Sequence, residues 1–124
     1  MNALGRHLLL ELKGCDRKLL DDLSFIRGAI MGAAEDAGAT IVGESFHKFQ
    51  PHGVTGLVAI AESHICIHTW PEYGYAAADV FTCGEDFDPG EAAEILIKKL
   101  HCSNPSTREI PRGLLTHQET SAAV

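Results

Sequence analysis

Residues 62–75 concentrate the side chains of this 124-residue chain that are best suited to chemistry. The segment holds a serine hydroxyl, two imidazoles, a thiol and a carboxylate, which belong to Ser63, His64, His68, Cys66 and Glu72. Because side chains along a strand alternate between its two faces, we expect His64, Cys66, His68 and Trp70 to share one face. Three interpretations of this row are open: a metal site, a nucleophile with its base, or a polar surface without chemistry.

A zinc site would take its ligands from His64, Cys66 and His68, with Cys83 of the neighbouring strand as a fourth. On a regular strand the Cα atoms of His64 and His68 lie about 13 Å apart, which is too far for both imidazoles to bind one ion. The spacing therefore argues against a resident metal.

Each of these residues also has an ordinary structural explanation. A single histidine on a strand is most often a hydrogen-bonded or surface residue, and a cysteine such as Cys66 suits a small apolar position. That explanation is weaker for the set as a whole. On two strands joined by a short turn, four side chains are expected to converge: Ser63, His68, Glu72 and Cys83.

Ser63 could also direct chemistry at its own chain. Its hydroxyl can attack the carbonyl carbon of Glu62 and form an ester, provided that local strain and hydrogen-bond donors stabilise the oxyanion. Thr55, near the start of the preceding strand, could be such a donor. A base must then remove the Cα proton of residue 63, and a histidine such as His68 titrates in the right range. The products would be residues 1–62 and a second chain, 63–124, that begins with a pyruvoyl group.

The composition indicates a single domain over residues 1–124 and argues against several kinds of partner. The net charge of −7 and the lack of a lysine and arginine cluster argue against nucleic acid. The chain shows neither a signal peptide nor a long apolar segment, so we expect no membrane partner and a cytoplasmic location. Four cysteines without a Cys-x-x-Cys pair fit reduced thiols.

Hydrophobic periodicity divides the chain into strands and two amphipathic helices. It predicts one helix over residues 16–37 and a second that begins at Asp88-Pro89, where Asp88 can cap and Pro89 suits the first turn. Alternation and turn signals predict strands at residues 4–12, 39–49, 54–61, 63–70, 75–82 and about 107–111. In the second strand, one face should carry Ile41, Gly43, Ser45, His47 and Phe49. We expect a flexible tail over about 114–124.

These elements predict an α+β fold, a two-layer sandwich of a mostly antiparallel sheet with two helices on one face. Short turns between successive strands require antiparallel neighbours. Two helices can cover only one face of such a sheet. The other face, where the reactive row could lie, therefore needs a partner or a substrate.

An ordered set of motifs runs through roughly four fifths of the chain. Among them are Leu4-Gly5-Arg6-His7, Phe46-His47-Lys48-Phe49, Pro51-His52-Gly53-Val54-Thr55-Gly56, Glu62-Ser63-His64, His68-Thr69-Trp70-Pro71-Glu72-Tyr73-Gly74-Tyr75 and Asp79-Val80-Phe81-Thr82-Cys83-Gly84. In these motifs the chain resembles the prokaryotic S-adenosylmethionine decarboxylase proenzymes, which are pyruvoyl-dependent. The likeness becomes loose after His101.

The resemblance implies the residues of self-cleavage. It implies that Ser63 becomes the pyruvoyl group, that Glu62 becomes the new carboxyl terminus and that His68 is the processing base. Thr55 stands where the family usually has serine, and it keeps the hydroxyl while adding a stiff β-branch.

The resemblance also implies how substrate is handled. Cys83 matches the donor that protonates the substrate carbon after carbon dioxide leaves. We therefore expect Cys83 to act after self-cleavage rather than during it, and a Cys83→Ala protein still to cleave itself. Phe49 matches a ring that stacks on adenine, and Glu72 matches a carboxylate that accepts hydrogen bonds from the ribose hydroxyls.

The implied reaction is decarboxylation of S-adenosylmethionine to S-adenosylmethioninamine, the aminopropyl donor for spermidine synthesis. A pyruvoyl carbonyl forms a Schiff base with the substrate amine and acts as an electron sink, so pyridoxal phosphate is not needed. The family also implies a homodimer, formed through the uncovered sheet region, with its sites near the interface. Two alternatives stay open: an arginine or ornithine decarboxylase on the same scaffold, and a homologue that serves only as a partner subunit.

Overall fold

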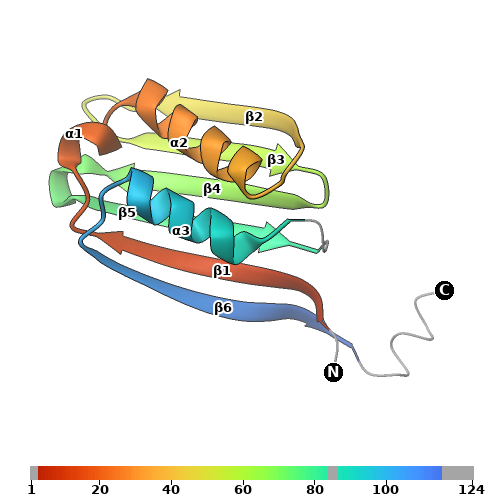
Figure 1. The fold of residues 1–124 in the computed structure, drawn as a ribbon. Coiled ribbons are helices and arrows are strands. Elements are labelled where there is room, and N and C mark those ends of the chain that lie inside the picture. The colour runs from red at the N-terminus through yellow and green to blue at the C-terminus, as the bar shows by residue number, and fades with distance from the viewer. Residues whose placement is uncertain (1–2, 84–86, 116–124) are drawn as a thin grey trace.

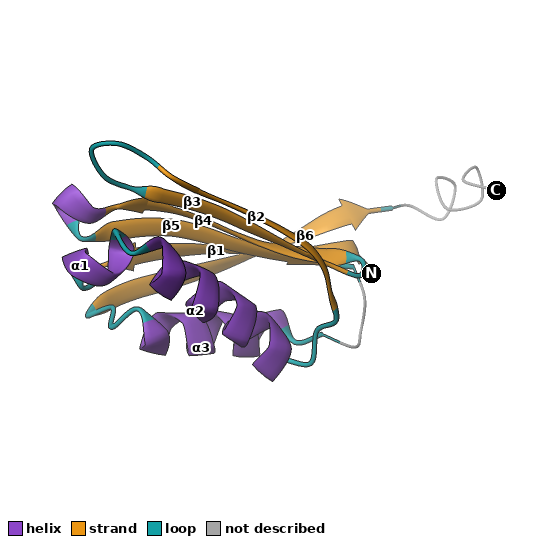
Figure 2. Ribbon diagram, turned by 90° about the horizontal axis from the view of Figure 1, so that it is seen from above, coloured by secondary structure: helices purple, strands orange, loops and turns teal. Residues whose placement is uncertain are grey.

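The computed structural model describes residues 3–83 and 87–115. Within them, six strands form one antiparallel sheet in the order β2-β3-β4-β5-β1-β6 (Figure 1). The strands are β1 (Ala3–Lys13), β2 (Ile41–Lys48), β3 (Val54–Ile60), β4 (Ser63–Trp70), β5 (Tyr75–Thr82) and β6 (Asn104–Leu114). The helices are α1 (Arg17–Leu20), α2 (Leu23–Asp36) and α3 (Pro89–Lys99), and a 3₁₀ turn, η1 (Pro71–Tyr73), joins β4 to β5. Figure 2 shows α2 and α3 side by side on one face of the sheet, which confirms the predicted two-layer α+β fold.

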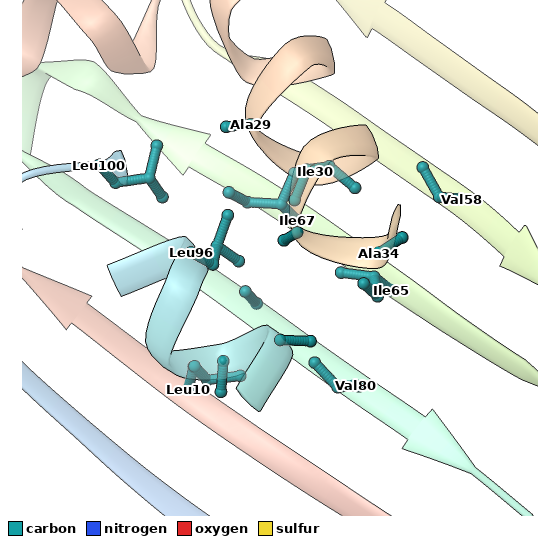
Figure 3. Close-up of a cluster of buried hydrophobic side chains, with 14 of the residues drawn as sticks. Leu10, Ala29, Ile30, Ala34, Val58, Ile65, Ile67, Val80, Leu96 and Leu100 are labelled. Carbon is teal, nitrogen blue, oxygen red and sulfur yellow. The ribbon is translucent and has the colours of Figure 1, made fainter. Parts of the chain in front are cut away.

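The hydrophobic core fills the space between the helices and the sheet (Figure 3). Its fully buried members include Ile30 of α2, Leu96 of α3, Ile65 and Ile67 of β4, and Val80 of β5. Residues next to these in the strands point the other way, because side chains alternate along a strand. The face opposite the helices therefore carries His64, Cys66, His68 and Trp70, as predicted.

The helix predicted over residues 16–37 is in fact two helices, separated at a pair of aspartates. The Asp22 carboxylate accepts a hydrogen bond from the N–H of Phe25 and caps α2. Asp21 instead accepts the N–H of Gly53, 2.8 Å away in the loop before β3. Short acidic side chains compete with the backbone carbonyls of a helix for N–H groups. At Asp21 and Asp22 this competition ends the helix, although the apolar periodicity continues.

The prediction that one face of β2 carries Ile41 together with Gly43 was wrong. Ile41 pairs with Ile60, but Gly43 pairs with Ala59, so β2 has one extra residue between them. Such a β-bulge exchanges the faces of the strand on either side of it. Ile41 consequently packs against the core, whereas His47 faces away from the helices and contacts the Phe49 ring.

The remaining elements follow the sequence closely, except at the C-terminal end. The strands at 63–70 and 75–82 have the predicted bounds, and Asp88 caps α3 through the N–H groups of Gly90 and Glu91. β6 is longer than predicted because it pairs with β1 along nearly its whole length. Most of the predicted tail, residues 116–124, lies outside the described residues. Among the described residues, the helices are too short and too polar to cross a membrane.

Candidate active site

The bond between Glu62 and Ser63 lies in a tight, strained turn. Ile60 pairs directly with Ser63, so the turn between β3 and β4 consists of Ala61 and Glu62 alone. Glu62 has a φ of 62°, in the left-handed region. For a residue with a side chain this conformation costs about 1–2 kcal/mol. Strain at the residue before Ser63 is one of the two conditions that self-cleavage requires.

The second condition, donors to the carbonyl oxygen of Glu62, is met by Cys83. Its backbone N–H lies 3.1 Å from that oxygen. Its thiol lies 2.8 Å from the same oxygen and donates to it. Two donors aimed at one carbonyl oxygen can stabilise negative charge that develops there when the carbonyl carbon is attacked. Sequence reasoning assigned this task to Thr55, which lies at the other end of β3.

Thr82 holds the Ser63 hydroxyl, a contact that sequence reasoning missed. The Ser63 Oγ donates to the Thr82 Oγ1 across 2.7 Å, and Thr82 is buried. The register could have been read from the sequence, because the turn at Pro71–Tyr73 pairs Trp70 with Tyr75 and counting outward places Ser63 opposite Thr82. A cavity of about 240 Å³ opens beside Glu62, Ser63 and Thr82.

A second group of predicted site residues surrounds a pocket of about 390 Å³. The pocket is lined by Phe49, Thr55, His68 and Glu72, together with Trp70 and His52 among others. Thr55 and His68 lie opposite each other on β3 and β4, with 3.1 Å between Oγ1 and Nδ1. The Glu72 carboxylate lies 3.0 Å from Nε2 of His52, a second residue that the sequence reading did not single out.

Contacts with Asp21 anchor the loop that carries Phe49 and His52. The N–H of Phe49 donates to the carbonyl of Gly53 at 2.8 Å, which closes the loop. Gly53 has a φ of 109°, a conformation that favours glycine. Its N–H donates to Asp21, and the Lys48 ammonium lies 3.0 Å from the same carboxylate. Both contacts hold the pKa of Asp21 below its usual range, the Gly53 N–H most strongly.

The two groups lie at opposite ends of β4, so the predicted convergence within one chain was wrong. Ser63 and His68 are five residues apart on one strand, about 17 Å at 3.3 Å per residue. They also face opposite ways, because Ser63 follows the core-facing side of β4 and His68 lies on the uncovered side. The turn at Pro71–Tyr73 is at the far end from Ser63. Cys83 therefore stays with Ser63, and Glu72 stays with His68.

The ligand set considered for zinc is not gathered. Within residues 3–83 and 87–115, one group of three His, Cys, Asp or Glu side chains brings its ligand atoms within 4.8 Å of one another, and it consists of His7, His64 and Asp79. Cys66, opposite Asp79 on the uncovered face, is half-buried. Burial and the nearby Asp79 charge raise the pKa of its thiol to about 11.

The group of His7, His64 and Asp79 is a hydrogen-bonded cluster with a cation already beside it. Nε2 of each histidine lies 2.9 Å from Oδ2 of Asp79. The Arg112 guanidinium lies 3.0 Å from Nδ1 of His7. Because a guanidinium can only donate, that nitrogen accepts, and Nε2 of His7 carries the proton that it shares with Asp79. The positive charge of Arg112 beside the cluster disfavours a second cation.

Comparison with known proteins decides the family. The model of the family described as S-adenosylmethionine decarboxylase matches residues 6–113, a span that includes both groups of site residues. The chain belongs to this family. The S-adenosylmethionine decarboxylase proenzyme of Thermodesulfovibrio yellowstonii is 51% identical over 118 residues, which are 95% of this chain and 87% of that protein. The proenzyme of Thermotoga maritima is 53% identical over 113 residues, with 91% and 87% covered.

Solved structures of S-adenosylmethionine decarboxylases are similar in fold. The crystal structure of the adenosylmethionine decarboxylase from Aquifex aeolicus superposes with a TM-score of 0.87 at 37% identity, over 94% of this chain and 97% of that one. The Trypanosoma brucei enzyme has a TM-score of 0.61 at 15% identity, over 82% of this chain and 44% of that one, which shows a shared fold.

Proposed function

We propose that this S-adenosylmethionine decarboxylase family member cleaves itself between Glu62 and Ser63 and then decarboxylates S-adenosylmethionine. The observation that carries the proposal is the state of the Glu62 carbonyl. Glu62 has a left-handed backbone conformation, and its carbonyl oxygen accepts two hydrogen bonds from Cys83. The next residue is Ser63, whose hydroxyl donates a hydrogen bond to Thr82. A serine in this setting suits conversion to the pyruvoyl group that the family uses.

Cleavage begins when Oγ of Ser63 attacks the carbonyl carbon of Glu62 and the peptide C–N bond breaks, which leaves an ester. The N–H and thiol of Cys83 stabilise the negative charge on the carbonyl oxygen during this step. A base removes the Cα proton of residue 63, the ester bond breaks, and Glu62 leaves as a carboxylate. Water then releases ammonia from residue 63, which becomes the pyruvoyl end of chain 63–124.

The pocket at the other end of β4 suits the adenosyl part of the substrate. The Phe49 side chain is 45% exposed there and offers a ring face for stacking on adenine and for attraction to the sulfonium. Glu72 can accept hydrogen bonds from ribose hydroxyls, with His52 orienting its carboxylate. A pyruvoyl group supplies the electrophile and electron sink for loss of the carboxylate. Cys83 stays beside residue 63 and can donate the proton that replaces the lost carboxylate on the substrate carbon.

A homodimer would bring the Ser63 group of one protomer together with the adenosyl pocket of the other. If the uncovered sheet faces pair about a two-fold axis that runs across the strands, one end of β4 meets the opposite end of β4 in the second copy. The residue 63 end of one protomer would then adjoin the pocket that contains the partner's Phe49, the partner's His68 and the partner's Glu72. The uncovered face suits burial, since Leu57 and Trp70 on it are 40% and 39% exposed. A shared site of this kind accounts for the separation of Ser63 from His68.

Cleavage is tested by the intact mass of freshly purified protein under denaturing conditions. Wild type should give a fragment ending at Glu62 and a second fragment with the mass of a pyruvoyl amino end. Ser63→Ala should stay a single chain. A wild-type chain that remains whole after prolonged incubation would overturn the proposal.

The shared site is tested by combining an inactive variant and a weakened variant in one dimer. Ser63→Ala lacks the pyruvoyl group, and Phe49→Ala weakens the adenosine pocket, but a mixed dimer contains one site in which both residues are native. Co-expression with two different tags, followed by purification through both, should yield decarboxylase activity approaching half that of wild type. A double mutant of Ser63 and Phe49 paired with wild type is the matched control. Activity in the mixed dimer no higher than that of Phe49→Ala alone would place each site within one chain.

A further inference from the structure

Two cysteines that are distant in sequence have adjacent thiols. Cys15 follows β1, Cys102 precedes β6, and their Sγ atoms lie 2.8 Å apart. The backbone around them is held in place by hydrogen bonds, from the N–H of Cys15 to Gly74 at 2.9 Å and from the N–H of Ser103 to Gly14 at 3.1 Å. The last residue pair of the β1–β6 ladder lies next to them. A bond between the sulfurs therefore needs little movement of the backbone.

The two thiols differ in access and acidity. Cys15 belongs to the buried core, whereas Cys102 is partly exposed. The hydrogen bond from Cys15 lowers the pKa of the Cys102 thiol. The same hydrogen bond, together with burial, raises the pKa of Cys15. Cys102 is thus the more accessible and the more acidic of the two thiols, so an oxidant from solution meets it first, with Cys15 placed to complete the reaction.

We propose that Cys15 and Cys102 form a reversible disulfide that ties the two products of self-cleavage together. Cys15 belongs to residues 1–62 and Cys102 to residues 63–124, so the bond would join chains that otherwise associate without a covalent link. This part of the inference rests on the proposed cleavage, but formation of the disulfide does not. In a reducing compartment both thiols stay free, and the link forms when a low-molecular-weight disulfide accumulates.

The exchange balances with glutathione disulfide as the oxidant. The Cys102 thiolate attacks one sulfur of glutathione disulfide and releases one glutathione thiolate. Cys15 then attacks the Cys102 sulfur of the mixed disulfide and releases the second glutathione. The protein loses two electrons and two protons, and the two glutathione molecules take them up.

The test uses the purified full-length protein with and without glutathione disulfide, followed by alkylation in denaturant and mass analysis without reductant. A proteolytic digest should contain one linked peptide pair, Cys15 with Cys102, that dithiothreitol separates. In cleaved protein, 1–62 and 63–124 should run as one covalent species. Cys102→Ser should abolish the link, whereas Cys66→Ser should leave it unchanged.

The outcomes separate the disulfide from the cleavage. A linked peptide pair in a chain that never cleaves supports the disulfide and contradicts the proposed self-cleavage. Separate fragments with alkylated Cys15 and Cys102 contradict the disulfide and support cleavage. A stable glutathione adduct on Cys102 also overturns the disulfide, because it would mean that Cys15 does not complete the exchange.

Discussion

The thiol of Cys83 lies 2.8 Å from the carbonyl oxygen of Glu62 and donates a hydrogen bond to it. One side chain is thus placed for two successive tasks. In the proposed reaction it would polarise the carbonyl that Ser63 attacks, and after cleavage it would remain beside residue 63, where a proton donor is needed. The resemblance alone suggested the second task, and the contact adds the first.

Cys83→Ala should therefore slow self-cleavage as well as decarboxylation. Loss of one oxyanion donor typically costs about 10²–10³ in rate, but a thiol is a weak donor and the backbone N–H remains, so we expect about a tenfold slower cleavage. The measurement is a time course of fragment formation, by denaturing mass spectrometry, after the unprocessed chain is refolded. Cys66→Ala is the control. Cleavage at the wild-type rate would restrict Cys83 to the decarboxylation step.

Phe49→Ala should weaken turnover of S-adenosylmethionine more than turnover of any simple amino acid. Stacking of a base on an aromatic side chain is worth about 1–3 kcal/mol, so kcat/KM should fall roughly five- to 150-fold. Carbon dioxide release from S-adenosylmethionine, arginine and ornithine measures the difference, and Phe49→Tyr keeps the ring as a control. Faster turnover of arginine or ornithine than of S-adenosylmethionine, insensitive to residue 49, would mean that the adenosyl assignment of this pocket is wrong.

Local features of this chain could be predicted because nearby residues determine them. The hairpin of β4 and β5 was predicted with its observed bounds, since a Pro-Glu-Tyr-Gly turn separates two runs of alternating residues. The break between α1 and α2 was missed because the competing contact of Asp21 lies in another loop, at Gly53. A periodic pattern cannot show which backbone N–H group will be near an aspartate in the fold.

The candidate site was predicted residue by residue but not as an arrangement. Phe49, Thr55, His68 and Glu72 line one pocket, while Ser63 lines another and Cys83 contacts the adjacent Glu62. The sequence-based expectation that Ser63 and His68 converge overlooked strand geometry, because five residues of strand reverse the face and span about 17 Å. Motif matching identifies residues but gives no distance between them, and residues that act at one site can come from two chains.

Thr69→Val should destabilise the fold. The buried Thr69 hydroxyl accepts the N–H of Val54 and donates to the carbonyl of Leu20, each across 2.8 Å. Valine has nearly the same shape but leaves both backbone groups unpaired, which should lower the free energy of unfolding by about 1–3 kcal/mol. Urea unfolding checks this, and Thr69→Ser should restore most of the loss. Equal stability of Thr69→Val and wild type would mean that water replaces the hydroxyl.

Asp21 should contribute stability that disappears in acid. Its pKa is lowered in the folded protein by the Gly53 N–H and by Lys48, so the ionised form favours folding. This contribution is complete above the unfolded-state pKa of about 3.9 and is lost as pH falls through the lower folded pKa. Asp21→Asn keeps an acceptor for Gly53 but removes the charge, so it should be less stable than wild type at pH 6, and the difference should shrink as pH falls below about 3.9. Urea unfolding at several pH values measures the difference in stability, and a difference that stays constant with pH would rule out the ionised carboxylate as the source.

Asp21→Ala should also raise KM for S-adenosylmethionine, because the loop that carries Phe49 loses its anchor.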